Sequence, residues 1–265
     1  MPEEASRAAL AQLLRWYADM GVDLAVDDAP HDRFAESQNL ERAPAVQPTP
    51  RRAAPIPTRT PASAPPPSPL AGIAEAAKAR TLEELQAELL AFEGCGLKAT
   101  ATQLVFADGN PQADIMFVGE APGADEDRIG RPFVGRAGQL LDKMLAAIGL
   151  DRTQVYIANV VPWRPPGNRT PTPLETGACL PFTRRQIELV APKILICLGA
   201  PSMQTLLGIK EGIMRSRGRW MAYDRAGTTI PAMAMLHPAY LLRQPSHKKF
   251  AWQDLRELAK KMREI

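Results

Sequence analysis

Acidic residues, aromatic residues and several glycines occur together in one part of the sequence, residues 117–138. This stretch leaves an apolar strand and enters a loop with glycine and proline, where the backbone can turn sharply. Its acidic residues are Glu120, Asp125, Glu126 and Asp127. The ring of Phe133 and the turn Gly135-Arg-Ala-Gly138 follow. These groups could hold an activated water, a base and a phosphate together. The alternative is a capped, solvated strand-to-helix loop, with Asp125 and Asp127 solvated or capping it.

Two more candidates stand at the ends of apolar strands. Asn159 lies in the run Val155–Val161, where a buried amide needs partners because an unsatisfied one costs about 1–3 kcal/mol. His237 follows the apolar run Ala232–Leu236 and precedes a proline. Both residues have a structural alternative, since an asparagine can cap the end of a sheet and a lone histidine can belong to the core.

Alternating strands and helices must position these residues. Apolar runs predict strands at 115–118, 155–161, 194–198 and 232–236, and a hairpin formed by 219–223 and 228–230. Helical spacing and caps predict helices at about 81–92, 139–148, 172–190, 201–207 and 248–262. The alternation predicts an α/β fold, a three-layer α/β/α sandwich with a central four-stranded parallel sheet. Ligands of such sheets bind at the carboxyl ends of the strands, where the candidates stand.

The chain divides into three parts. Residues 1–27 predict a short amphipathic helix, whose apolar face is expected to dock on the main domain or on a partner protein. Residues 28–70 hold 11 of the chain's 26 prolines and predict a disordered linker, because such a segment buries too little apolar surface to fold. Residues 71–265 have the composition of a globular domain, and the candidate catalytic residues all lie there.

Composition limits the classes of function. The net charge of +3 permits a nucleic-acid partner without demanding one. No apolar run reaches the roughly 18 residues that a membrane span needs, and the N-terminus lacks the pattern of a signal peptide. Three cysteines argue against a disulfide framework. We therefore expect a protein of a reducing compartment, the cytoplasm or the nucleoid. We also expect a monomer, although no sequence feature determines the oligomeric state.

Five motifs, taken together and in this order, resemble the family 4 uracil-DNA glycosylases: Gly119-Glu-Ala-Pro-Gly123, Gly130-Arg-Pro-Phe-Val-Gly135, Asn159, Arg164-Pro-Pro-Gly-Asn168 and His237-Pro-Ala-Tyr-Leu-Leu-Arg243. The resemblance implies a uracil-DNA glycosylase fold and hydrolysis of the N-glycosidic bond of deoxyuridine in DNA. The implied partner is uracil-containing DNA, single- or double-stranded. No lysine occurs in the motifs, so we expect a monofunctional enzyme that forms no Schiff base.

The resemblance also implies roles for individual residues. Phe133 matches the ring that stacks on the flipped uracil, and Asn159 matches the amide that pairs with the uracil edge. His237 matches the histidine set against uracil O2, where it stabilises charge on the departing base. Glu120 matches the glutamate that activates water, and Glu126 is a second carboxylate of the pocket. The implied uracil site also includes Gly119 and Ala121.

A further set of matching residues is expected to contact the DNA backbone. Its members are Gly135, Arg136, Gly138, Arg164 and Arg243. Leu241 and Leu242 form the tip of the last loop and are expected to wedge into the minor groove. The alternative for these two leucines is packing beneath the loop.

The cysteine pattern departs from the family. Family 4 members hold a [4Fe–4S] cluster on four cysteines, and Cys95 and Cys179 stand at two of these positions. Phe92 and Trp163 occupy the other two, and their bulky apolar side chains could fill the volume of a cluster. We therefore predict that the protein has no cofactor and no metal, and that the two cysteines lie close together as free thiols.

Three alternatives stay open at this level. The domain could bind and trap uracil-DNA without turnover, although it lacks the histidine-bearing insert after the second strand that cross-linking relatives use. The pocket could accept other deaminated bases, such as hypoxanthine or xanthine. The N-terminal helix and its linker could recruit a repair or replication protein, such as a polymerase.

Overall fold

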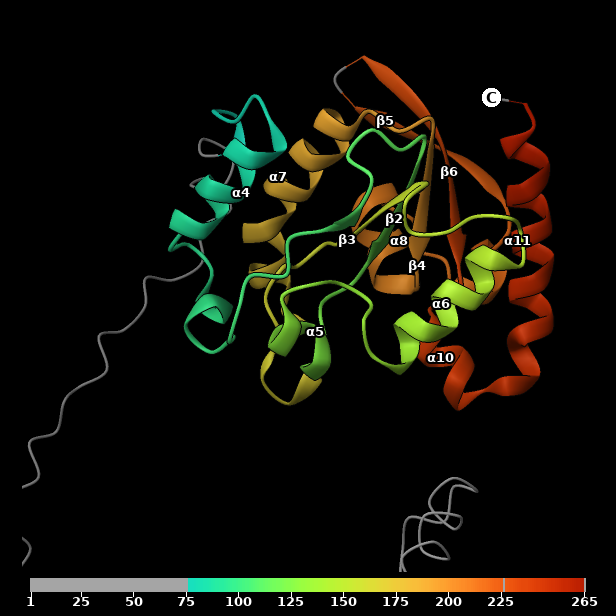
Figure 1. The fold of residues 1–265 in the computed structure, drawn as a ribbon, viewed down its shortest axis with the longest axis horizontal. Coiled ribbons are helices and arrows are strands. Elements are labelled where there is room, and N and C mark those ends of the chain that lie inside the picture. Colours follow the sequence, from blue (N-terminus) through green and yellow to red (C-terminus); the bar gives the residue numbers. More distant parts are fainter. Residues whose placement is uncertain (1–75, 226, 265) are drawn as a thin grey trace, which may run out of the picture. The chain divides into compact units, whose positions relative to one another are not determined.

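Six strands form one mixed sheet in the computed structural model, which describes residues 76–225 and 227–264 (Figure 1). In chain order the strands are β1 (Asp108–Gly109), β2 (Ile115–Gly119), β3 (Val155–Asn159), β4 (Ile194–Leu198), β5 (Trp220–Arg225) and β6 (Thr228–Met235). Their order in the sheet is β1-β3-β2-β4-β6-β5. The inner strands β3, β2, β4 and β6 run parallel, whereas β1 and β5 pair antiparallel at the edges. The predicted four-stranded parallel sheet is thus the centre of a larger sheet.

Helices cover both faces of the sheet and complete the three predicted layers. One face carries α4 (Leu82–Ala91), α7 (Pro173–Val190) and α8 (Ala200–Leu207); the other carries α6 (Arg136–Ala146), α10 (Pro238–Arg243) and α11 (Lys248–Met262) (Figure 1). The connections contain α5 (Ala124–Ile129), α9 (Ile213–Ser216) and the 3-10 turns η1 (Gly96–Ala99), η2 (Pro166–Asn168) and η3 (Pro245–His247). The predicted capping box begins α7, since the side chains of Thr172 and Glu175 each accept a hydrogen bond from the other's backbone N–H.

Each inner strand separates two hydrophobic cores because its side chains alternate between the two faces. In β2, Met116 and Val118 pack in the core under α4 and α7, while Ile115 and Phe117 pack in the core under α6 and α11. Every residue of β2, β3 and β4 is buried. The strands themselves therefore leave no exposed side chain for chemistry, and functional groups must come from the strand ends.

The last part of the sheet differs from the prediction. The expected strands 228–230 and 232–236 are one continuous strand, β6, with Pro231 inside it. A proline has no N–H to donate to a ladder, which is why the sequence indicated a break. Pro231 is tolerated because the parallel ladder to β4 begins only at the next residue, Ala232, while Pro231 faces Ala222 of the edge strand β5.

The predicted N-terminal helix and proline-rich linker lie outside the described residues. Within the described parts of the chain, no helix is long and apolar enough to cross a membrane.

Candidate active site

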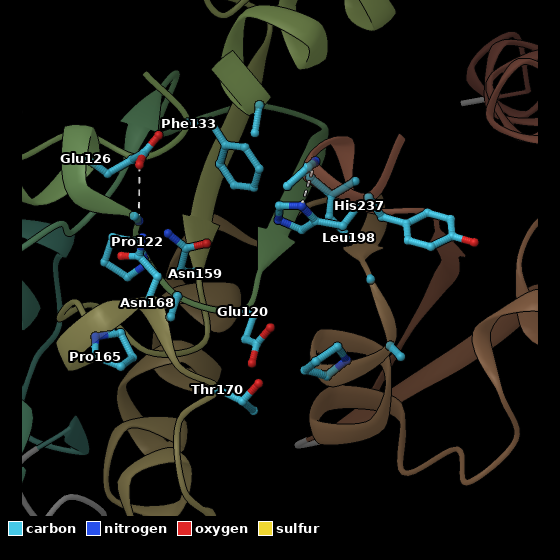
Figure 2. A pocket seen from close by; sticks show the side chains of 18 of the residues that line it. Glu120, Pro122, Glu126, Phe133, Asn159, Pro165, Asn168, Thr170, Leu198 and His237 are labelled. Carbon is cyan, nitrogen blue, oxygen red and sulfur yellow. Dashed lines mark hydrogen bonds between the residues drawn. The ribbon is translucent and has the colours of Figure 1, made fainter. Parts of the chain in front are cut away.

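The carboxyl ends of β2 and β3 bring two candidate residues together. Gly119 and Asn159 are partners at the last position of the parallel pair. Backbone pairing continues past it, because the N–H of Val160 donates to the carbonyl of Gly119 at 3.0 Å and that of Val161 to the carbonyl of Glu120 at 2.9 Å. Glu120 therefore leaves β2 beside the side chain of Asn159 (Figure 2).

A cavity of about 570 Å³ opens at this edge of the sheet. Its lining comes from the loops that follow β2, β3, β4 and β6, as sequence reasoning expected. The lining includes Glu120, Ala121, Glu126, Phe133, Asn159, Thr170, Gly199, His237, Tyr240 and Arg243. The volume is in the range of small-molecule sites, so one planar base with neighbouring atoms can enter it.

The ring of Phe133 forms one wall of the cavity. It is 4% exposed and faces the His237 ring, with 5.5 Å between centroids and 30° between planes (Figure 2). The backbone of Phe133 has a φ of +54°, which L-residues rarely adopt. Gly119 has no side chain to fill the space beside this ring, since a Cβ there would stand 2.8 Å from Phe133 Cζ and 2.4 Å from Asn159 Oδ1. The glycine therefore keeps the ring and the amide accessible to a ligand.

The amide of Asn159 is available to a ligand. Its residue is only 5% exposed, and no other residue in the described ranges forms a hydrogen bond with the side chain. The amide lines the cavity, so a ligand bound there can supply its hydrogen-bond partners. This combination favours ligand recognition over the capping role that the sequence left open.

Glu120 is a cavity carboxylate with one oxygen that lacks a hydrogen-bond partner among the described residues. Its Oε1 is buried and has no hydrogen-bond partner among residues 76–225 and 227–264. Burial raises the pKa of Glu120, and the nearby Thr170 hydroxyl opposes that rise (Figure 2). A half-buried carboxyl group with a raised pKa and a free oxygen is suited to accept a proton from a water molecule.

His237 presents a neutral imidazole to the cavity. The N–H of Ala239 donates to its Nδ1 at 3.1 Å, so the proton of the neutral ring sits on Nε2. Burial, together with the smaller effect of the Arg243 charge, lowers the pKa of His237 to about 4. At neutral pH the ring can therefore donate one hydrogen bond through Nε2 without carrying a positive charge.

Glu126 lines the cavity, and its carboxylate accepts hydrogen bonds from the loop around it. Its Oε2 accepts the N–H of Gly123 at 3.1 Å (Figure 2). Its Oε1 accepts those of Val134 at 3.0 Å and Gly135 at 2.9 Å. Three backbone donors hold the group, so it fixes the loop around α5. Asp127 is buried, and its carboxylate accepts hydrogen bonds from the N–H and the hydroxyl of Thr102, each at 2.8 Å, which ties α5 to the segment before β1.

The two glycines expected at DNA phosphates are used inside the protein. The N–H of Gly135 donates to Glu126, so it is not free for a phosphate. Gly138 is buried, and a Cβ there would stand 1.6 Å from the carbonyl oxygen of Phe133. It lets helix α6 approach the Phe133 turn. Between them, Arg136 is exposed at the start of α6.

The last loop divides its residues between core and surface. Leu241 is 1% exposed and packs in the core under α6 and α11, so the structure shows the packing alternative and excludes it as a wedge in this conformation. Leu242 is half-buried, and Arg243 is exposed and lines the cavity. Arg164 does not line the cavity and donates from Nε to Asn168 at 2.7 Å.

Thr170 and Tyr240 are among the cavity residues that sequence reasoning did not select. Thr170 stands close to Glu120, and Tyr240 lines the wall with its hydroxyl 2.8 Å from Nδ1 of His247. Tyr240 lay inside a quoted motif, so its aromatic ring was a usable signal. Thr170 carried no signal, because a threonine in a proline-rich loop is usually a turn or cap residue.

Comparison with known proteins now identifies the family. The profile described as "Uracil DNA glycosylase superfamily" matches residues 106–256. The chain belongs to this superfamily. It is 40% identical over 182 residues to a type-4 uracil-DNA glycosylase of Archaeoglobus fulgidus, covering 67% of this chain and 92% of the relative. It is 41% identical over 191 residues to a type-4 uracil-DNA glycosylase of Sulfurisphaera tokodaii, covering 70% and 84%.

A third type-4 uracil-DNA glycosylase, from Thermotoga maritima, is 44% identical over 155 residues, which is 58% of this chain and 79% of the relative. The resemblance stated from the motifs is therefore confirmed, and the chain is a type-4 member of the superfamily. The predicted uracil-DNA glycosylase-like α/β/α fold is confirmed with it.

The residues at the expected cluster position do not fit a [4Fe–4S] group. Cys95 and Cys179 are buried, with 3.6 Å between their Sγ atoms, as the predicted neighbouring thiols. Phe92 and Trp163, each 2% exposed, pack in the same core and offer iron no ligand. In the parts of the chain that the structure describes, no three His, Cys, Asp or Glu side chains converge to hold a metal ion. Two thiols are half of the ligand set that such a cluster normally needs.

Proposed function

We propose that this protein is a monofunctional uracil-DNA glycosylase that flips uracil out of DNA and releases it by hydrolysis, which begins base excision repair. The observation that carries the proposal is one cavity in which three groups meet. These are the unpartnered carboxylate oxygen of Glu120, the free amide of Asn159 and the neutral imidazole of His237. The type-4 relatives support hydrolytic excision over a module that traps DNA without turnover.

Recognition of the base uses a ring and an amide. Flipping a base from the stack costs a few kcal/mol, and stacking on Phe133 returns about 1–3 kcal/mol. The amide of Asn159 can accept the N3–H of uracil and donate to O4. Cytosine presents the reverse pattern, so it would leave buried polar groups mispaired, and such a mismatch discriminates by as much as about 10⁴–10⁵.

Bond cleavage places negative charge on the departing base. As the bond between C1′ and N1 breaks, its electron pair goes to uracil, and the charge spreads onto O2. The Nε2–H of His237 faces that oxygen as a neutral donor. A comparable donor in an oxyanion site lowers the activation free energy by about 2.7–4 kcal/mol. Because Nδ1 already accepts the Ala239 N–H, the ring is held in the tautomer that this role requires.

The water that completes the reaction is assigned to Glu120. Its ionised carboxylate accepts a proton from water as the oxygen attacks C1′, and it stabilises the cationic sugar before that. Among the described residues that line the cavity none is a lysine, which fits hydrolysis without a Schiff base. Arg136, Arg164, Leu242 and Arg243 are proposed to contact the DNA around the flipped nucleotide, and Gly119 and Ala121 to border the uracil.

We also propose that the enzyme works without the [4Fe–4S] cluster of its family, since Phe92 and Trp163 stand where two ligands would be. Iron and acid-labile sulfide assays on anaerobically purified protein test this, and stoichiometric iron would contradict it. We place the enzyme in the cytoplasm with the nucleoid DNA. Residues 1–27, on the linker 28–70, are proposed to contact a repair or replication protein.

The decisive experiment is a single-turnover assay on a uracil-containing oligonucleotide, followed by alkali. Strand scission is expected after alkali and not before it, with large losses in Glu120→Ala and Asn159→Ala. Scission before alkali would indicate a lyase. Binding without base release in the unmodified protein would reject the enzyme function.

A further inference from the structure

An arginine behind the Phe133 turn grips two consecutive backbone carbonyls. The guanidinium of Arg152, from the segment just before β3, donates from Nη2 to the carbonyl of Phe133. Its Nη1 donates to the carbonyl of Pro132 at 3.2 Å. A planar guanidinium presents its donors in a fixed fork, so two carbonyls held by one group cannot rotate independently.

The guanidinium is itself anchored from two sides. Its Nη1 lies 2.5 Å from Oδ2 of Asp108 in β1, and its Nε lies 2.7 Å from Oδ1 of Asp142 in α6. Asp108 is also paired with Arg131 at 3.0 Å. The Arg152 side chain is 20% exposed, and its two carboxylate partners raise its pKa against the effect of burial. Arg152 therefore stays charged and ties β1, α6 and the Phe133 turn together.

The Phe133 turn is a place where such a grip matters. Phe133 has a φ of +54°, a conformation that costs free energy in an aromatic residue and persists only when neighbours enforce it. Its carbonyl oxygen lies against Gly138, which has no Cβ to fill the gap. The ring beyond that backbone faces His237 across the cavity. A rotation of the Phe133 carbonyl would move the ring out of this position.

We propose that Arg152 is the positioning residue of the base-stacking wall: it holds the strained Phe133 turn and thereby sets where the ring meets the flipped base. It acts through Phe133 and touches neither base nor sugar, since it is absent from the residues that line the cavity. The inference depends on the proposed stacking role of Phe133.

Two binding measurements and a double-mutant cycle test the proposal. Inhibition by free uracil reports the base site, and affinity for an oligonucleotide with a tetrahydrofuran abasic site reports DNA contacts in the absence of a base. Arg152→Met is expected to weaken free-uracil inhibition at least about fivefold, the lower range of one base–aromatic stack, with affinity for abasic DNA unchanged. In a Phe133→Ala background the same change should add almost nothing, because the ring it positions is gone.

Several variants keep the proposal falsifiable. Arg152→Lys retains the charge but loses the fork, so it should give an intermediate inhibition constant. Asp108→Asn weakens the ion pair with Arg152, so it should raise the inhibition constant for free uracil by a smaller factor. If Arg152→Met does not fold, Arg152→Lys and Asp108→Asn provide the test. Arg185→Met is the matched control, because Arg185 likewise holds one carbonyl, that of Ala79 at 3.0 Å, and one carboxylate, Glu188 at 2.9 Å, away from the cavity. It should leave uracil inhibition unchanged.

Three results would overturn the inference. A multiplicative loss in the double variant would show that Arg152 acts independently of Phe133. An equal loss of affinity for abasic DNA would make it a DNA-contact or folding residue. Unchanged uracil inhibition in Phe133→Ala alone would remove the stacking role first, which separates failure of the proposed function from failure of the inference.

Discussion

Two regions of the molecule differ in how they treat polar groups. One is the cavity edge, and the other is the two-thiol core, which consists of Cys95 and Cys179 with Phe92 and Trp163 packed in the same core. At the cavity edge, polar atoms are held without partners: Oε1 of Glu120 has none among the described residues, and the amide of Asn159 is open. In the two-thiol core, the ring of Phe92 lies 4.9 Å from that of Phe182 and over Gly94, where a Cβ would meet it at 2.3 Å. A polar atom without a partner marks the cavity edge, whereas packed aromatic rings fill the space around the two thiols.

The Glu120→Gln variant tests the cavity side of this contrast. The amide cannot take a proton from water, so the single-turnover rate should fall about 10²–10⁴-fold, the usual contribution of a general base. Binding of uracil-DNA should persist. Glu83→Gln, an exposed change on α4, is the matched control and should keep the normal rate. A rate within threefold of normal in Glu120→Gln would assign the water to another group.

The Phe92→Ala variant tests the two-thiol side. Removing this 2% exposed ring should lower the free energy of unfolding by about 3–5 kcal/mol, as for other buried phenylalanines. The rate per folded molecule should not change at temperatures below the new melting point. Chemical denaturation and single-turnover kinetics on the same samples give both values. A lower rate in fully folded protein would show that the two-thiol core acts on the cavity.

Two neighbouring leucines allow the same contrast within one helical turn. Leu241→Ala should cost about 2–5 kcal/mol of stability, because the side chain is 1% exposed. Leu242→Ala should cost less stability and weaken binding to uracil-DNA, since Leu242 is half-buried. Denaturation and DNA affinity, measured for both variants, decide the assignment. The reverse pattern would restore Leu241 as the wedge.

The pH profile separates the contributions of Glu120 and His237. Burial raises the pKa of Glu120, so the rate should climb with pH as its carboxylate forms, at higher pH than for an exposed glutamate. The raised pKa also makes stability depend on pH. The folded state binds this proton more tightly than the unfolded chain does, so the free energy of unfolding decreases as pH rises through the raised pKa. His237, with a pKa of about 4, stays neutral near pH 7 and should cause no change of rate with pH there. The climb should vanish in a Glu120→Gln profile.

The strand ends and the reactive side chains were predictable from sequence because apolar runs and their flanking residues are local signals. Asn159 and His237 stand where the pattern placed them, and Cys95 and Cys179 are neighbours as expected. The hydrogen bonds of the Glu126 carboxylate were not predictable, because its three N–H donors reach it only after the chain folds back between residues 123 and 135.

Burial within short helices was also beyond local signals. Leu241 and Leu242 are adjacent and chemically alike, and only the docking of α10 against α6 decides which one is buried. Gly138 resembled a phosphate-binding glycine, yet its missing side chain serves the approach of one carbonyl. Such choices depend on contacts between segments far apart in the sequence, which periodicity does not report.

The shared register of β2 and β3 has an evolutionary consequence. The amide proposed to select the base and the carboxylate proposed to drive hydrolysis follow one another along a single ladder, at Gly119–Asn159 and at Glu120–Val161. A one-residue insertion or deletion in either strand would displace both at once, so selectivity and speed would be lost together. Descendants of this enzyme with a new base preference should therefore differ from it by exchanged side chains around an intact ladder, with length changes confined to the outer loops.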